Sequence, residues 1–372
     1  MAAAPPFRAD HVGSLLRPAA LHDARAMVQR GELGAAQPRE IEDRAILDAV
    51  ALQESVGMNA ITDGEFRRGH YLVDFLTGFT GIVPTHTSYA LAFKGEGGAT
   101  GETRSMLTVT EKIRRARPVM LDAFKFLHAA TKRTPKVCLP SPTWIHMRGG
   151  PKTVSKTAYP DIEEFWSDLV LAFHEELKDL AAAGCTYVQL DEISFAFLCD
   201  SEIRDRVRAD GLDPDRLTQD YARVVNAIAA GAPDTMTVTV HTCRGNFQSM
   251  WMAEGGYERV AGMVFNQPDV DGYFLEYDSD RAGGFEPLKY IPKHKKVVLG
   301  LVSSKKPELE SKDALKRRID EAAKFFPLDR LCLSPQCGFA STHHGNLVTE
   351  DIERRKLALI VEVATEVWGS AV

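Results

Sequence analysis

Two kinds of apolar pattern alternate along the chain. Short runs of β-branched and aliphatic residues predict buried strands, and longer segments whose apolar residues recur every three or four positions predict amphipathic helices. The predicted strands cover residues 10–16, 60–65, 136–143, 187–192, 237–243, 272–277, 296–302 and 331–338. The predicted helices cover residues 39–57, 116–131, 160–183, 214–230, 257–263, 312–326 and 349–367.

This alternation predicts an α/β fold with a parallel sheet. Eight strands, most of them followed by a helix, in a chain of 372 residues favour a closed (β/α)8 barrel of the TIM type over an open, doubly wound sheet. No GxGxxG or P-loop sequence follows the first predicted strand, which weakens a nucleotide-binding alternative. Residues 70–115 interrupt the rhythm with Gly, Thr and aromatic residues, so we expect an inserted hairpin there, within a single barrel domain spanning residues 1–372.

Composition and charge exclude several classes of protein. The chain is 44% hydrophobic and 26% charged, and its net charge of −6 provides no basic surface for nucleic acid or an anionic membrane. No apolar run approaches the roughly 20 residues of a membrane span, and the first residues lack the apolar core of a secretory signal. We therefore expect a cytoplasmic protein without nucleic-acid or membrane partners. The sequence leaves its oligomeric state open, including a homo-oligomer.

Polar and ionisable residues gather where the predicted strands end. In a (β/α)8 barrel, the carboxyl ends of the strands and the loops after them form the active site. The residues at these ends are Ser14, Asp63, Glu65, Thr143, Asp191, Glu192, His241, Cys243, Glu276, Ser303, Ser304 and Cys337. Scattered surface charge would not produce this distribution, so we expect the functional site at this end.

Four of these residues have the chemistry of zinc ligands. His241 and Cys243 lie two positions apart on a predicted strand, so their side chains share one face. Cys337 ends the last predicted strand, and Glu276 interrupts an apolar strand where an unpaired carboxylate would be costly to bury. One imidazole, two thiolates and one carboxylate make a tetrahedral zinc set.

Each of these ligands also has a purely structural explanation. His241 and Cys243 fit a hydrogen-bonded histidine beside a packed cysteine. The six cysteines form no CxxC pair and predict reduced thiols, most of them small core residues, and Cys337 fits that description too. Glu276 fits an ion pair with Arg244 or Arg281 equally well.

The carboxylates at two other strand ends suit an amino-acid substrate. Glu65, together with Asp191 or its neighbour, would hold an ammonium group, and Ser14 with the backbone beside it would hold a carboxylate. The alternative is that the carboxylates form structural ion pairs with arginines. The candidate partners are Arg17, Arg67 and Arg68.

Seven segments, in this order, resemble the catalytic C-terminal barrel of the cobalamin-independent methionine synthase family. They are HVGSLLRP (11–18), TDGEFRR (62–68), QLDE (189–192), HTC (241–243), FLEYD (274–278), LGLVSSKKPELE (299–310) and SPQCG (334–338). They span nearly the whole chain, and the His-x-Cys…Glu…Cys constellation is the most specific of them.

The resemblance implies a zinc-dependent methyltransferase that moves a methyl group from a methyltetrahydrofolate to the thiol of homocysteine, giving methionine. The implied zinc ligands are His241, Cys243, Glu276 and Cys337, and the implied homocysteine-binding residues are Ser14, Glu65 and Asp191. The chemistry is consistent, because a zinc ion deprotonates a bound thiol at neutral pH and the thiolate is the nucleophile.

Two features depart from the family pattern. Full-length members carry an additional N-terminal barrel, which this sequence does not contain. The family places an acid histidine after the seventh strand, where this chain has Lys305, and a lysine with a pKa of about 10.4 is a poor acid. Either His343 or His344 supplies the proton instead, or the donor is not a polyglutamyl methylfolate. Trp144 lies where a flat donor ring would stack, and an aromatic residue at the rim of the barrel explains it equally well.

Other functions remain open at this point. One is a zinc-dependent alkyltransferase with another thiol or donor, such as methylcobalamin, or an epoxyalkane–coenzyme M transferase. The acidic Glu65 and Asp191 argue against a sulfonate-bearing thiol. A metal-free decarboxylase of the uroporphyrinogen type would not need the four-ligand set. A non-catalytic zinc- or thiol-binding barrel would be closed by four firm ligands, whereas a weak carboxylate ligand favours catalysis.

Overall fold

The computed structural model describes residues 4–34, 37–70, 72–95, 98–140, 142–266 and 269–372. Ser141, in the loop that ends the strand predicted over 136–143, lies outside the described residues.

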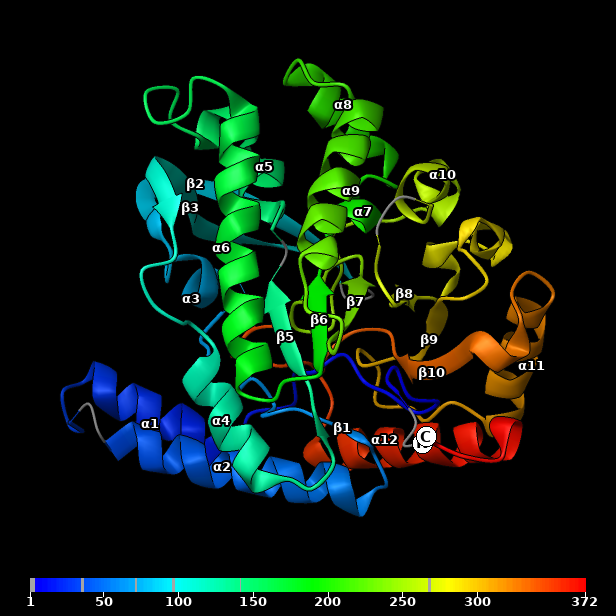
Figure 1. Cartoon of the computed structure of the whole chain (residues 1–372). Coiled ribbons are helices and arrows are strands. Elements are labelled where there is room, and N and C mark those ends of the chain that lie inside the picture. The colour runs from blue at the N-terminus through cyan, green and yellow to red at the C-terminus, as the bar shows by residue number, and fades with distance from the viewer. Residues whose placement is uncertain (1–3, 35–36, 71, 96–97, 141, 267–268) are drawn as a thin grey trace.

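A parallel sheet of six strands forms the centre of the molecule, in the order β10-β9-β8-β7-β6-β5 (Figure 1). The strands are β5 (Val137–Pro140), β6 (Tyr187–Asp191), β7 (Thr237–Thr242), β8 (Gly272–Glu276), β9 (Lys296–Val302) and β10 (Leu331–Pro335). A separate parallel pair joins β1 (Ala60–Ile61) to β4 (Thr134–Pro135). The predicted α/β class with a parallel sheet is confirmed.

Helices follow most of the strands and surround the sheet (Figure 1). The α-helices are α1 (Ala19–Gln29), α2 (Gln37–Ser55), α3 (Val73–Leu76), α4 (Leu121–Ala130), α5 (Trp144–Gly149), α6 (Ile162–Ala182), α7 (Ser194–Phe197), α8 (Ser201–Ala209), α9 (Pro214–Ala230), α10 (Ala261–Val264), α11 (Lys312–Ala323) and α12 (Glu350–Trp368). Short 3₁₀ helices are η1 (Gly150–Thr153), η2 (Tyr257–Arg259), η3 (Asp280–Ala282), η4 (Glu286–Tyr290) and η5 (Leu328–Arg330). No helix of the described chain is long and apolar enough to span a membrane.

Local signals explain where the helices begin. The Asp213 side chain accepts a hydrogen bond from Asp215 N, and Pro214 supplies the fixed φ of a first helical residue, so α9 begins there. Asp161 caps α6 in the same way by accepting from Glu163 N. The helix predicted over 257–263 is instead divided into η2 and α10. Helix α1 and the short α5, α7 and α8 are not among the predicted helices.

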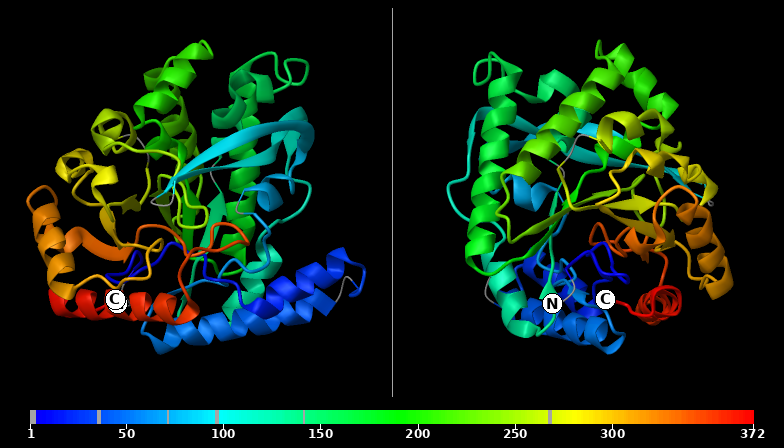
Figure 2. Two further views of the ribbon diagram at one scale, coloured as in Figure 1. Left: turned by 180° about the vertical axis from the view of Figure 1, so that it is seen from behind. Right: turned by 45° about the vertical axis from the view of Figure 1, so that its right-hand side comes forward.

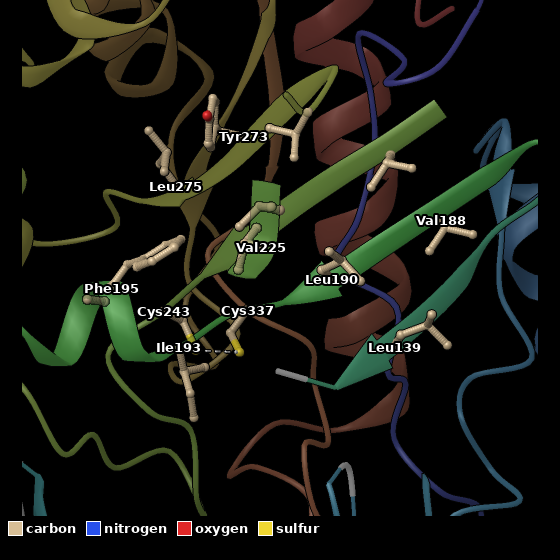
Figure 3. Close-up of a cluster of buried hydrophobic side chains, with 14 of the residues drawn as sticks. Leu139, Val188, Leu190, Ile193, Phe195, Val225, Cys243, Tyr273, Leu275 and Cys337 are labelled. Atoms are coloured by element: carbon tan, nitrogen blue, oxygen red, sulfur yellow. Dashed lines mark hydrogen bonds between the residues drawn. The ribbon is translucent and has the colours of Figure 1, made fainter. Parts of the chain in front are cut away.

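Alternation along the strands separates the core from the site. In β6, Val188 and Leu190 belong to the main hydrophobic core, which Figure 3 shows together with Leu139 of β5. The intervening Gln189 and Asp191 point to the other face of the strand, where Gln189 Nε2 donates to Asp191 Oδ1 at 2.7 Å. Because side chains alternate along the strand, one face of β6 packs into the core and the other face carries the polar groups.

The strand predicted over residues 10–16 is wrong. The preceding residue, Ala9, forms an isolated bridge with Leu333 of β10, but residues 10–16 do not form a strand. The physical reason is local, because the Asp10 side chain accepts from the N–H groups of Phe7 and His11, and Gly13 adopts a φ of +129°. A regular ladder cannot continue through these conformations.

Further backbone hydrogen bonds lie beside the β1–β4 pair, and one of them involves Lys136, the residue between β4 and β5. Leu15 N donates to Gly64 O at 3.1 Å, and Lys136 N donates to Ile61 O at 2.8 Å. The order of paired strands nevertheless describes two separate parallel sheets.

The insertion predicted near residues 70–115 is confirmed as an antiparallel hairpin of β2 (Thr80–Gly95) and β3 (Gly98–Arg114). Figure 2 shows this long hairpin arching across the molecule toward the loops that follow the central strands. Its distal part is held by reciprocal backbone hydrogen bonds between Lys94 and Trp251, and Phe93 stacks on Phe247 with ring centroids 4.7 Å apart. The hairpin thus covers the loop that follows β7.

Candidate active site

Three of the predicted zinc ligands lie together at the carboxyl ends of their strands. His241 is in β7, Cys243 follows that strand, and Cys337 follows β10. The ligand atoms of His241, Cys243 and Cys337 all lie within 4.8 Å of one another, and all three residues are buried. The two Sγ atoms are 3.6 Å apart and hydrogen-bonded, and Figure 3 shows the two cysteine side chains pointing toward each other.

The chemistry of this cluster fits a metal ion. Both ring nitrogens of His241 are buried without a hydrogen-bond partner among the described residues. Buried polar atoms are normally paired, so an unpaired imidazole beside two thiols indicates a missing partner. Imidazole and thiolate are ligands that zinc prefers.

The protonation states of the cluster are strongly shifted. The hydrogen bond to Cys243 and the neighbouring His241 hold the pKa of the Cys337 thiol well below its usual range. The same hydrogen bond, together with burial, raises the pKa of Cys243. Burial alone would lower the pKa of His241, but the Cys337 sulfur and nearby carboxylates outweigh it and raise the pKa. One thiol of the pair therefore ionises easily, as metal binding requires.

Glu276 does not belong to this three-residue cluster. The carboxylate at the end of β8 is fully buried, and its Oε2 accepts from Arg244 N at 2.7 Å. Its Oε1 forms an ion pair with Arg281 Nη2 at 3.0 Å. Burial would raise the pKa of Glu276, but Lys305, Arg244 and Arg281 together lower it. The structure thus shows the ion pair with Arg281, and the role of Glu276 as a metal ligand stays a prediction.

The predicted substrate-binding residues line the same pocket as the cluster. Ser14, Glu65 and Asp191 face it together with His241, Cys243 and Cys337. Glu65, which has a left-handed φ of 59°, forms an ion pair with Arg68. Burial and the carboxylates of Asp191 and Asp63 raise the pKa of Glu65 to about 8, against the effect of Arg68. Burial also raises the pKa of Asp191.

Two glycines allow the segments of this pocket to approach closely. A Cβ on Gly338 would lie 1.9 Å from Ser14 Oγ, and a Cβ on Gly13 would lie 2.8 Å from Glu65 Oε1. Both distances are shorter than the non-bonded contacts that Cβ atoms make in proteins, so neither position has room for a side chain. Ser14 therefore reaches the pocket because glycine occupies the position opposite it.

Trp144 also lines the pocket, at the start of α5, and its ring is already in contact with neighbours. The Arg148 guanidinium lies 4.1 Å from the ring centroid, and Phe197 meets the ring edge-on at 5.1 Å. Arg148 and Phe197 line the pocket as well. Arg148 and Phe197 are absent from the predicted site. The i, i+4 spacing of Trp144 and Arg148 on a helix is the sequence signal that would have indicated contact between those two side chains.

The predicted proton donors do not line the pocket. Lys305 is buried, and its positive charge lowers the pKa of Glu276 and Cys337. His343 and His344 are exposed, with ring centroids 3.9 Å apart. Their catalytic roles stay predictions.

His70 lines the pocket, and its Nδ1 accepts from Leu72 N at 3.2 Å. The sequence analysis did not identify His70, although it lies two residues after the TDGEFRR segment (62–68).

Comparison with known proteins decides the family. A family model described as the catalytic domain of cobalamin-independent synthase matches residues 7–366. The chain belongs to the cobalamin-independent methionine synthase family. The resemblance carried by the seven sequence segments is confirmed. This is a family of methionine synthase-like methyltransferases that use a metal and act on small molecules such as homocysteine and a methyl donor.

The relatives differ in how much is known of them. The chain is 43% identical to each of two uncharacterised Bacillus subtilis proteins, YxjH and YxjG, over 98% of its length and 95% of theirs. A 5-methyltetrahydropteroyltriglutamate–homocysteine methyltransferase of Thermotoga petrophila is 23% identical over 92% of this chain, which matches 43% of that protein.

A solved structure supports the same fold. The putative vitamin-B12-independent methionine synthase of Listeria monocytogenes is 34% identical, with a TM-score of 0.78, and the match covers 99% of this chain and 100% of that one. A methionine synthase from Shewanella, solved with selenomethionine, has a TM-score of 0.70 at 20% identity, over 97% of each chain.

Proposed function

We propose that this protein is a zinc-dependent S-methyltransferase that moves a methyl group from a methyltetrahydrofolate-type donor to the thiol of homocysteine, giving methionine. The observation that carries the proposal is that one pocket is lined by the His241, Cys243 and Cys337 cluster and by the Glu65 and Asp191 carboxylates. The histidine and cysteine cluster suits a thiol bound to a metal, and the two carboxylates suit the ammonium group of an amino acid.

Each end of homocysteine has a partner in this scheme. The ammonium group binds between Glu65 and Asp191, and the carboxylate binds Ser14 and the adjacent backbone. This requires Arg68 to give up its ion pair with Glu65 to the incoming ammonium group. A zinc ion on His241, Cys243 and Cys337, with Glu276 as a fourth ligand, would supply chemistry that keeps the substrate sulfur as a thiolate at neutral pH.

A methylfolate donor also requires a proton on its leaving nitrogen. His70 is better placed than Lys305, His343 or His344, since it lines the pocket. Its Nδ1 accepts the Leu72 N–H, so the neutral ring carries its proton on Nε2. The hairpin contributes Phe93, stacked on Phe247, to the wall of the pocket and helps to exclude water.

The proposal extends to the fold. We propose that the segment at residues 8–15, β1, and β4 with β5 complete a closed (β/α)8 barrel in a single domain. The Ala9–Leu333 bridge, the Leu15–Gly64 hydrogen bond and the Lys136–Ile61 hydrogen bond support this closure.

The test is metal content together with methyl transfer to homocysteine, comparing mono- and polyglutamyl methyltetrahydrofolate with methylcobalamin as donors. We expect about one zinc per chain and folate-dependent methionine formation. Zinc without turnover on any of these donors would redirect the proposal to another thiol or alkyl donor. Absence of zinc from carefully prepared protein would refute it.

Glu276→Gln separates a catalytic site from a non-catalytic zinc-binding one. In a catalytic site, we expect turnover to fall while zinc stays bound to His241, Cys243 and Cys337. In a scaffold site, zinc content should fall as well, because the substitution would weaken one of four firm ligands. Zinc content is the readout, because loss of the buried ion pair with Arg281 would lower the free energy of unfolding in both cases.

A further inference from the structure

One buried lysine differs from the other buried lysines of the described chain. Lys136, Lys295 and Lys356 each donate a hydrogen bond from Nζ to a carboxylate or a backbone carbonyl. Lys305 is 6% exposed, yet its Nζ has no hydrogen-bond partner among the described residues. A buried ammonium group without a hydrogen bond is costly, so its place in the fold requires an explanation.

The loop that carries Lys305 is held to two of the strand ends that form the site. It follows β9, which lies between β8 and β10 in the sheet. Ser303 Oγ donates to Asp278 Oδ2 at 2.9 Å in the segment after β8. Ser304 Oγ donates to Gly338 O at 3.0 Å in the segment after β10. Lys305 is therefore fixed beside the ends of both strands that contribute predicted metal ligands.

The charge of Lys305 acts on the negative groups of the site. Burial would raise the pKa of Glu276, and Lys305 lowers it more than Arg281 does, although Arg281 Nη2 pairs with that carboxylate at 3.0 Å. The hydrogen bond between Cys243 and Cys337 and their burial have the largest effects on the pKa of each thiol. The Lys305 charge then favours the thiolate form of both.

We propose that Lys305 is a fixed counter-cation of the metal cluster and makes the site prefer an anionic thiolate substrate over a neutral thioether product. The inference rests on the proposed function, since homocysteine would bring its thiolate to the His241, Cys243 and Cys337 cluster. It assigns Lys305 a role in specificity that acts through charge and requires no proton transfer.

The charge balance of the site explains this preference. Two cysteine thiolates already neutralise a divalent ion, so a substrate thiolate and the Glu276 carboxylate would leave an excess of negative charge. A buried cation offsets such an excess more strongly than a solvated one, because the protein interior screens charge weakly. Methylation turns the substrate sulfur into an uncharged thioether, which gains nothing from Lys305. The product would therefore be held less tightly than the substrate.

Calorimetric titration of zinc-loaded protein tests the inference without requiring turnover. The two probes are homocysteine and methionine, which share the amino-acid end and differ in whether the sulfur can be anionic. Each is titrated into the wild-type protein, Lys305→Met and Lys305→Arg. Lys306→Met is the matched control, since Lys306 is the adjacent residue and is exposed. Zinc content and urea unfolding are measured for every variant.

We expect Lys305→Met to weaken homocysteine binding by about 10- to 100-fold, the effect of one unit charge acting over several ångströms in a protein interior. Methionine binding should change by less than about twofold, because its sulfur carries no charge. Lys305→Arg keeps the charge and should recover most of the homocysteine affinity. Lys306→Met should match the wild type for both probes. If Lys305→Met loses zinc, recovery of zinc in Lys305→Arg would support the counter-cation.

Three results would overturn the inference. They are unchanged homocysteine affinity in Lys305→Met, an equal loss of homocysteine and methionine affinity in that variant, and failure of Lys305→Arg to restore the property that Lys305→Met loses. The second result would indicate a purely structural role.

Failure of the wild type to bind homocysteine would instead refute the proposed function. The same comparison is then made with 2-mercaptoethanol and its S-methyl ether, which lack the amino-acid end. A preference for the free thiol that Lys305→Met abolishes would support the inference, and no such preference would overturn it.

Discussion

The buried ionisable residues of the pocket contrast with those elsewhere in the core. Outside the pocket, burial raises the pKa of Cys185 and Cys199 to about 12 and that of Cys332 to about 11. Inside it, Cys337 is equally buried, yet its pKa is held well below the usual range by the hydrogen bond to Cys243. Burial is common to both regions, so it does not explain the difference.

Proximity explains it. An isolated buried thiol has no partner for a negative charge and stays neutral. The pocket instead holds groups in close sets: two thiols beside an imidazole, and two carboxylates beside an arginine. The pKa values of the two thiols are shifted in opposite directions, which is typical of sites that bind ions or move protons.

The largest effect should follow from removing one thiol of the cluster. Cys337→Ser should lose bound zinc, and methyl transfer should fall by more than about 100-fold. Even residues that only hydrogen-bond to a metal ligand contribute about 10- to 100-fold to metal affinity or activity. Cys332→Ser is the matched control, because Cys332 is also fully buried but lies in another hydrophobic cluster. Metal analysis and initial rates check both variants. Equal zinc content in the two variants would show that Cys337 in the pocket does not differ from Cys332 in the core as a metal ligand.

A smaller effect should follow from neutralising either carboxylate of the pocket. Glu65→Gln and Asp191→Asn each remove a charged partner of the substrate ammonium group. We expect the KM for homocysteine to rise about 10- to 100-fold at constant zinc content. Steady-state kinetics with varied homocysteine measure this. A fall in kcat at unchanged KM would place these residues in the chemical step instead.

The raised pKa of Glu65, about 8, predicts a pH dependence. Below that pH the carboxyl group of the empty pocket holds a proton and cannot pair with an ammonium group. Homocysteine affinity should therefore rise about three- to tenfold between pH 7 and pH 8.5. Calorimetric titration across this range checks the expectation. Glu65→Gln should flatten the profile, and an unchanged slope in that variant would assign the dependence to another group.

The smallest effect on activity is expected at an isolated acid outside the pocket. Glu353 accepts from Leu16 N at 2.8 Å, and burial raises its pKa to about 8. The unfolded chain releases this proton near pH 4.5, so folding stability falls as pH rises from there to about 8.

The contribution is up to about 1.4 kcal/mol per pH unit, and Glu353→Gln should remove it. Urea unfolding at several pH values measures the slope, and methyl transfer should stay within about twofold of the wild type. A large loss of activity would show that Glu353 is coupled to the pocket after all.

Several features of the molecule follow from sequence alone. The TVTV run before His241 predicts a buried strand, and the two-residue spacing places His241 and Cys243 on one face, because side chains alternate along a strand. Helix α9 begins at its predicted residue because Asp213 and Pro214 are strong local signals for a helix start. The inserted hairpin is indicated by a break in the alternation of predicted strands and helices between residues 70 and 115.

Other features required the folded chain. Whether Asp191 or Glu192 faces the pocket depended on the register of β6, and Glu192 instead accepts from Thr143 Oγ1. The partner of Glu276 depended on where Arg281 lies. No local signal reports these contacts, since they join residues that the chain brings together from different elements.

The sequence thus determined the residue types of the site and the strand ends that carry them, because strand periodicity and helix caps act over a few residues. The tertiary structure decided which of these groups meet. Phe93 reaches the pocket through contacts between the hairpin and the loop after β7, and Arg148 contacts Met252 across that pocket. Such contacts depend on packing between segments far apart in the chain. That packing decides which ionisable groups lie close enough to shift one another's pKa.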